Sequence, residues 1–226
     1  MTELDVLFRT VSSLSRLRIL AYLLHLPTGA VGTPPSRMAS ALGLSRGLVS
    51  FHLKALLRAR LVRYWKKERT KFYNLARTRR GSLRSRLLDA IRLELPEGYA
   101  ERRLPERPTR DATPDQRLRF LEHAVPDRTP LESLWMAFTS FSHFRRLLLI
   151  AHLLRVGAAP VGELAGVMDL SERTTLYHVD KLERRKGLRS ASRGLALAPQ
   201  EEGLHRTLWG LVTRTLGDTP RPRGPA

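Results

Sequence analysis

The side chains of this sequence best suited to chemistry are clustered cations, not paired acids or thiols. Arg46, Ser50 and Lys54 recur every four residues, so on an α-helix they share one face. Arginine can donate two parallel hydrogen bonds to guanine or phosphate, and serine and lysine suit base edges or phosphate oxygens. On an ordinary solvated helix the same residues would bind nothing. The position of the helix in the fold must therefore decide between the two interpretations.

A second group of cations follows a few residues later. It comprises Arg63, Lys66, Lys67, Arg69 and Lys71. Such density is typical of a loop that lies along a phosphate backbone or in the minor groove, where it adds affinity with little reading of sequence. The neighbouring aromatic residues Trp65 and Tyr73 are expected to pack a hairpin rather than to stack on bases.

The charge balance supports a polyanionic partner. The 226 residues include 40 Lys and Arg against 21 Asp and Glu, a formal net charge of +19. Residues 1–95 hold 19 basic and 5 acidic residues, residues 96–130 hold 7 of each, and residues 131–226 hold 14 and 9. An excess concentrated at one end indicates nucleic acid first and an anionic membrane surface second.

Other classes of function lack their signatures. There is no cysteine, which excludes disulfides, thiolate metal sites and cysteine nucleophiles and fits a reducing cytosol. The sequence has no Gly-rich phosphate loop and no His-Glu-x-x-His pattern, so neither an enzyme nor a cofactor is expected. The acidic N-terminus is unlike a signal peptide, and the longest apolar run, residues 147–154, is too short to span a bilayer. We expect a cytoplasmic, nucleoid-associated protein without membrane partners.

One pattern of apolar residues occurs twice in the sequence. "LSRLRILAYLL" at residues 14–24 matches "FRRLLLIAHLL" at 144–154 at an offset of 130. Residues 38–56 match 164–182 at an offset of 126, which places His52 on His178. Loose similarity between amphipathic helices is the alternative, but internal duplication is the more economical interpretation.

Each copy predicts the same order of elements. A long helix comes first, then a short helix, a tight turn at Gly43 or Asp169, a third helix capped by Ser45 or Ser171, a hairpin and a last helix. In the first copy the predicted spans are 4–24, 36–42, a helix from 45, strands 61–65 and 71–75, and 82–95. In the second copy they are 131–156, 162–168, a helix from 171, a hairpin turning near 192–194, and 201–216.

The predicted fold class is mostly α with small β-hairpin wings, arranged as two tandem winged helix-turn-helix domains. The first domain covers residues 1–95 and the second covers 131–216. Residues 96–130 are a Pro-rich linker with a short helix near Thr113, and residues 217–226 are a disordered basic tail. Val49, Leu53 and Leu56 are expected to face the first core.

The segment from 14 to 75, with "SRGLVSFHLKAL" and a basic hairpin, resembles an ArsR-type winged-helix repressor domain, and residues 144–197 are a weaker echo of it. Several winged-helix families share this motif. The resemblance implies double-stranded DNA as the partner, a recognition helix that contains His52, and dimers that pair through their first and last helices. It also implies metal sensing in many members, but the cysteine version is absent here and no metal site is expected. The predicted DNA-binding residues are Ser45, Arg46, Ser50, His52, Lys54, Arg63, Lys66, Lys67, Arg69 and Lys71.

The second copy departs from the first at its third helix. Glu172, Leu176 and Asp180 stand at the positions where the first copy has its three outward polar residues, and only Arg193 lies near the tip of its shorter hairpin. We therefore expect a degenerate second domain, used for pairing either as an intramolecular pseudo-dimer or in a homodimer.

Two functions fit these observations. The first is a DNA-binding transcription regulator whose N-terminal winged helix reads the major groove. The alternative is an architectural or replication-associated DNA-binding protein with little sequence specificity, and a competition between duplexes at fixed salt separates the two.

Overall fold

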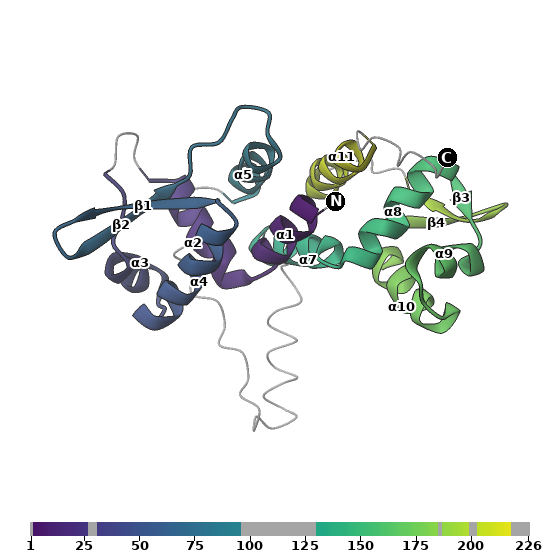
Figure 1. Ribbon diagram of the computed structural model, residues 1–226, viewed down its shortest axis with the longest axis horizontal. Coiled ribbons are helices and arrows are strands. Elements are labelled where there is room, and N and C mark those ends of the chain that lie inside the picture. The colour runs from purple at the N-terminus through teal and green to yellow at the C-terminus, as the bar shows by residue number, and fades with distance from the viewer. Residues whose placement is uncertain (1, 27–30, 96–129, 185–186, 199–202, 218–226) are drawn as a thin grey trace, which may run out of the picture. The chain divides into compact units, whose positions relative to one another are not determined.

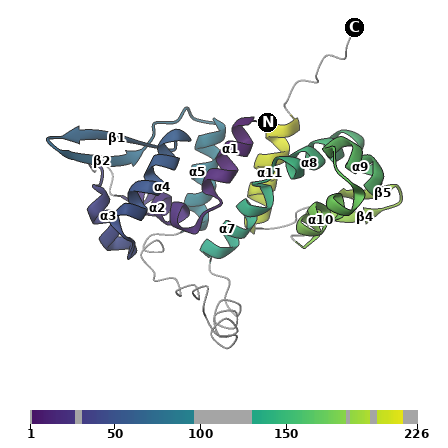
Figure 2. The ribbon, with the colours of Figure 1, turned by 60° about the horizontal axis from the view of Figure 1, so that its bottom comes forward.

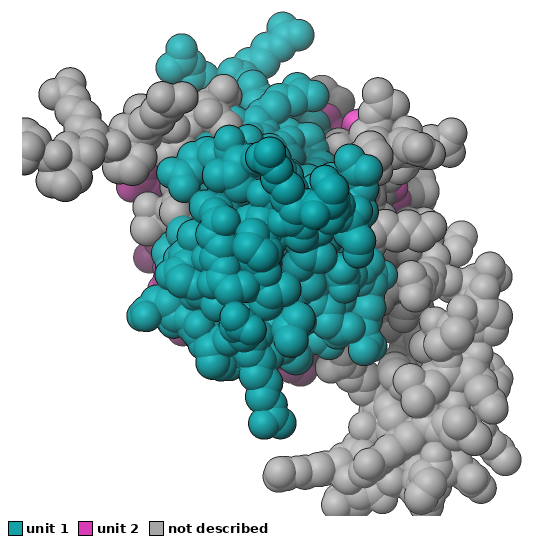
Figure 3. Space-filling view, turned by 90° about the vertical axis from the view of Figure 1, so that its right-hand side faces the viewer, with its two compact units in different colours: residues 1–12, 78–90, 136–226 teal, residues 13–77, 91–135 magenta. Residues whose placement is uncertain are grey.

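The computed structural model describes residues 2–26, 31–95, 130–184, 187–198 and 203–217 (Figure 1). Its contacts divide the chain into two compact units. Unit 1 comprises Met1–Ser12, Thr78–Ala90 and Met136–Ala226, and unit 2 comprises Ser13–Arg77 and Ile91–Trp135. Figure 3 colours them teal and magenta. The short helix predicted in the linker and the predicted disordered tail lie outside the described residues.

The helix-turn-helix predicted in the first copy is present in unit 2. It consists of α2 (Leu14–Leu24), α3 (Pro35–Leu42) and α4 (Arg46–Arg58). Gly43 ends α3 in the left-handed region with a φ of 62°, a conformation that glycine adopts without a steric penalty. Ser45 then caps α4, because its hydroxyl accepts a hydrogen bond of 3.2 Å from the backbone N–H of Leu48. The predicted turn and cap are both confirmed.

The inner face of α4 carries the apolar residues that the sequence assigned to the core. Val49, Leu53 and Leu56 are fully buried, and they anchor α4 to the rest of the helix-turn-helix. Met38 of α3 and Leu20 of α2 are fully buried as well. This packing fixes which side of α4 faces outward.

A two-stranded hairpin follows α4, as predicted. It is formed by β1 (Val62–Lys67) and β2 (Thr70–Leu75), paired antiparallel. The strands are longer than the sequence indicated, because pairing continues to Lys67 and Thr70 and leaves a two-residue turn at Glu68 and Arg69. Thr33, just before α3, forms an isolated bridge with Tyr73 of β2 and so ties the hairpin to the helices.

The opening helix of each copy is broken in two, and our prediction of one continuous helix was wrong in both places. The first copy opens with α1 (Thr2–Val11) before α2, and the second with α7 (Pro130–Phe141) before α8 (Phe144–Val156). Ser12 and Ser142 donate their hydroxyls to carbonyls three residues earlier, Arg9 and Thr139. Such local bonds offer the backbone an alternative to the helix ladder, and the helix restarts after them.

The second copy repeats the order of the first within unit 1. After α8 come β3 (Ala158–Ala159), α9 (Val161–Met168), α10 (Glu172–Glu183), β4 (Leu188–Ala191) and β5 (Gly194–Leu197). The strand order is β3-β5-β4. Asp169 takes the left-handed turn position with a φ of 52°, and Ser171 caps α10 by accepting 3.3 Å from the N–H of Thr174. The last helices of the two copies are α5 (Leu83–Glu94) and α11 (Gly203–Gly217).

Unit 1 contains an aromatic cluster drawn from both ends of the sequence. The ring of Phe8 in α1 lies 5.4 Å from that of Phe138 and 5.6 Å from that of Phe141, both in α7. Phe141 also lies 5.4 Å from Trp209 of α11. Figures 1 and 2 both show α1, α7 and α11 beside one another. The opening helices of the two sequence repeats therefore share one core.

Candidate nucleic-acid interface

The outward face of α4 is cationic and contains an aromatic ring. Arg46 and Lys54 are exposed as predicted, whereas Ser50 is only half-buried at the side of the helix. The exposed residues that point most directly away from the buried stripe are Gly47, Phe51 and Arg58, and Phe51 is 64% exposed. The polar stripe singled out in the sequence is thus one flank of the exposed face rather than its centre.

Sequence reasoning missed Gly47 and Phe51 because it selected side chains by polarity. The missing signal was geometric: once Val49, Leu53 and Leu56 define the inner face, the positions opposite to them follow from the helical period. Applied to the sequence, that argument would have placed Phe51 on the exposed face of the helix.

His52 does not lie where the predicted interface needed it. Its side chain is 8% exposed and points inward from α4, and its Nδ1 atom has no hydrogen-bond partner. Burial, with a smaller contribution from the charge of Arg16, lowers the pKa of His52 below its usual value. The imidazole therefore favours its neutral form near pH 7 and packs on the inner side of α4, which fits a structural role.

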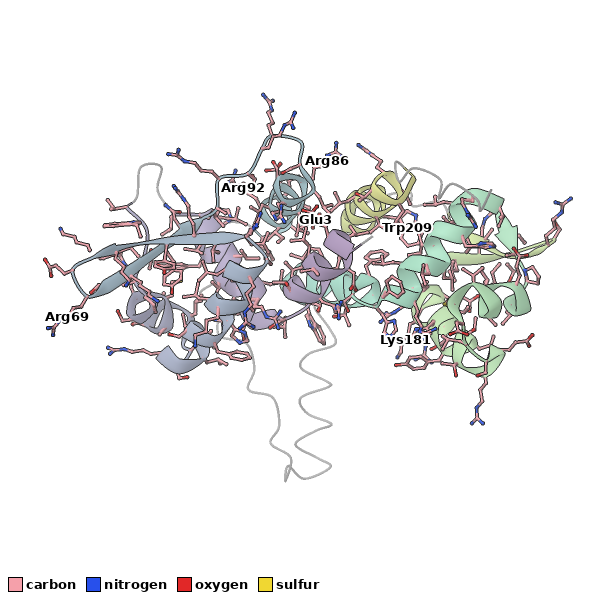
Figure 4. All side chains as sticks on the ribbon, viewed as in Figure 1. Glu3, Arg69, Arg86, Arg92, Lys181 and Trp209 are labelled. Carbon is pink, nitrogen blue, oxygen red and sulfur yellow. The ribbon has the colours of Figure 1, made fainter. Side chains whose placement is uncertain are left out.

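The hairpin presents its cations to solvent. Arg63, Lys66, Lys67, Arg69 and Lys71 are all exposed. Arg69 lies at the tip, as Figure 4 shows, and Lys66 pairs directly across the strands with Lys71. Like charges opposite each other weaken a hairpin, and an anion bound beside them would relieve this repulsion.

Aromatic residues stiffen the same hairpin. Trp65 stacks on Phe72 with ring centroids 4.8 Å apart, and its indole N–H donates 2.7 Å to the carbonyl of Val31. The ammonium of Lys71 lies 4.8 Å from the centroid of the Tyr64 ring. These contacts hold the strands in a defined shape, as expected for a wing that must present charge at a fixed position.

The charge around these elements is strongly one-sided. Residues 13–77 hold 13 basic residues and a single acid, Glu68, at the hairpin turn. The corresponding stretch of the second copy, residues 143–198, holds 10 basic and 5 acidic residues. A positive potential of this kind attracts a polyanion over distances near the Debye length.

The outward face of α10 is different in kind. Glu172 is exposed at the start of the helix, and Asp180 forms an ion pair of 2.8 Å with Arg184. Tyr177 is 58% exposed, with the ammonium of Lys181, labelled in Figure 4, 5.3 Å from its ring centroid. Its charges largely neutralise one another, so this helix lacks the excess of cations found on α4.

The equivalent of His52 in the second copy is also buried. His178 is 5% exposed, and its ring lies 4.5 Å from that of His143. Burial, followed by the charges of His143, Arg146 and Arg145, lowers the pKa of His178 to about 4. Both third helices therefore carry a neutral histidine on the inner side.

Two absences hold for the part of the chain that the structure describes. No three His, Cys, Asp or Glu side chains come together there in a way that could hold a metal ion. No helix there is both long enough and apolar enough to cross a bilayer.

Comparison with known proteins identifies one domain. A family model described as a helix-turn-helix domain matches residues 11–64, which include α2, α3, α4 and the first half of β1. No curated protein and no solved structure matches the chain. The chain thus contains a helix-turn-helix domain, followed by a small antiparallel hairpin as in a winged helix, and this domain indicates DNA binding.

Proposed function

We propose that this protein is a transcription regulator that reads double-stranded DNA with its first winged helix. The observation that carries the proposal is α4, a capped helix that exposes Arg46 and Lys54 and no acid, beside a hairpin with five exposed cations. In this arrangement α4 enters the major groove and the hairpin contacts the backbone. The resemblance to ArsR-type repressors supports the same assignment.

The second copy serves in pairing. At the offset of 130 that aligns the two copies, Phe8 corresponds to Phe138, and these two rings contact each other. Contact between a residue and its own equivalent is the signature of a two-fold, isologous interface. This supports an intramolecular pseudo-dimer in which α7 takes the position that α1 of a second chain would have in a homodimer.

The proposal is tested by reversing charges on α4. The double variant R46E/K54E removes two cations from the exposed face and places two acids there, while every buried contact of α4 remains. We expect its affinity for a duplex selected from a random library to fall by about 100-fold or more, because each groove or phosphate contact contributes about 1–3 kcal/mol. A gel-shift or anisotropy titration at fixed salt measures this loss.

The matched control is the opposite reversal on α10. E172K/D180K adds cations at the equivalent positions of the second copy, and we expect no loss of affinity. If this variant weakened binding as severely as R46E/K54E does, the assignment of DNA reading to the first copy would be wrong. If wild-type protein bound all duplexes equally, the architectural or replication-associated function would replace the regulator.

A further inference from the structure

The centre of the exposed face of α4 is apolar. Phe51 exposes 64% of its surface there, and the cations Arg46 and Lys54 lie on the flank beside it. A single exposed apolar residue is common on proteins and needs no explanation by itself. Its position matters here, because under the proposed function this ring points at the floor of the major groove.

The neighbouring residue leaves room for a close approach. Gly47 lies one turn before Phe51 on the same face, and a Cβ atom added there would meet no atom within 4 Å. A glycine inside an exposed helix costs about 1 kcal/mol relative to alanine, and packing within the protein does not require it here. Because Gly47 has no side chain, the edge of a base pair can approach the helix closely enough to contact the ring of Phe51.

The ring of Phe51 also contacts the side chain that follows it in α4. Phe51 and the buried, neutral His52 meet edge to face, with centroids 5.4 Å apart and an interplanar angle of 68°. Edge-to-face pairs of this kind are a favourable arrangement of rings. The phenyl ring therefore has one ring contact within α4 while most of its surface remains open to a ligand.

We propose that Phe51, over the space left by Gly47, contacts the 5-methyl group of a thymine in the major groove, an inference that rests on the proposed function. The methyl group is the one apolar feature of the base edges in that groove, and phenylalanine is among the side chains that contact it. The flanking cations disfavour a purely apolar protein partner at this position. The first winged helix therefore requires a T·A pair at one step of its site, in addition to any guanine read by Arg46.

The experiment replaces each thymine of the selected duplex, one at a time, with deoxyuridine, which pairs identically and lacks only the methyl group. For wild-type protein we expect one or two adjacent positions at which affinity falls about fourfold, the loss that corresponds to one methyl group left in water. F51A should bind the unmodified duplex more weakly and show no penalty at those positions, and F51L should keep part of the penalty. K54A is the matched control, because it should weaken all duplexes alike and keep the penalty.

The possible failures are distinguishable. The proposed methyl contact is wrong if the wild-type protein prefers its duplex but no deoxyuridine reduces its affinity, or if F51A keeps the full penalty. In either case the proposed function as a transcription regulator is unaffected. If no duplex is preferred at all, both proposals fall. Since Phe51 is mostly exposed, F51A should melt within a few degrees of the wild type, which a thermal scan at the same pH verifies.

Discussion

At the scale of single residues, the buried histidines of the third helices make the fold sensitive to acid. The pKa of His178 is about 4, whereas a histidine of the unfolded chain titrates near 6.5. Between these values the unfolded state binds more protons, so the free energy of unfolding decreases as the pH falls from about 6.5 to about 4. Above pH 6.5 this contribution is fully present.

The pH dependence is testable by urea unfolding at pH 7 and pH 5. We expect His178 to account for about 2 kcal/mol of the stability lost between these two values. H178L removes the titrating group that faces His143, Arg145 and Arg146, so its stability should fall less over the same interval. Identical losses in the variant and in the wild type would contradict the assignment.

Single residues also show where polarity alone is a poor guide to which side chains of a helix face outward. The sequence correctly placed Arg46 and Lys54 outside, because charged side chains are rarely buried without a partner. It also included His52, whose side chain faces inward, and it passed over Phe51. Both choices followed residue type rather than the helical period fixed by the buried leucines and valine.

At the scale of elements, the tight turn of the second copy is strained. Asp169 holds a φ of 52°, in the left-handed region where a side chain costs about 1 kcal/mol, and Gly43 holds the same position in the first copy. We expect D169G to raise the free energy of unfolding by about 0.5–1 kcal/mol in urea denaturation. G43D is the reciprocal control and should lower it by a similar amount. Equal stability of D169G and wild type would show that the aspartate compensates for its strain.

The elements themselves were largely predictable from local chemistry. Ser45 and Ser171 are good caps in front of periodic apolar residues, and both start a helix as expected. The breaks after α1 and α7 were not predicted, because Ser12 and Ser142 are tolerated within helices. Only their hydrogen bonds to the preceding turn, seen in the structure, show that each helix ends there.

At the scale of the whole molecule, the contact between Phe8 and Phe138 should contribute strongly to stability. Both rings are almost fully buried, so F8A and F138A should each cost about 3–5 kcal/mol. Because the rings touch, the double variant should lose about 0.5–1.5 kcal/mol less than the sum of the single variants. Urea denaturation of the full chain completes this cycle, and strictly additive losses would contradict a direct contact in solution.

This pairing lay beyond what the sequence could predict. The duplication indicated two similar halves and left open whether each half pairs within the chain or with a second molecule. Residues 8 and 138 are separated by a long Pro-rich segment, and no local periodicity determines which distant apolar face covers another. Tertiary contacts in the structure were needed to bring α1 and α7 together.

If the second copy is a partner tethered in the same chain, as we propose, the occupancy of the DNA target depends differently on the number of protein molecules. A repressor assembled from separate subunits loses its active form on dilution, whereas a covalently attached half keeps a fixed local concentration however scarce the molecule becomes. Occupancy of the target would then rise in simple proportion to the number of molecules at low levels, with no threshold. Under that proposal, a few copies per cell would suffice to keep the DNA target occupied.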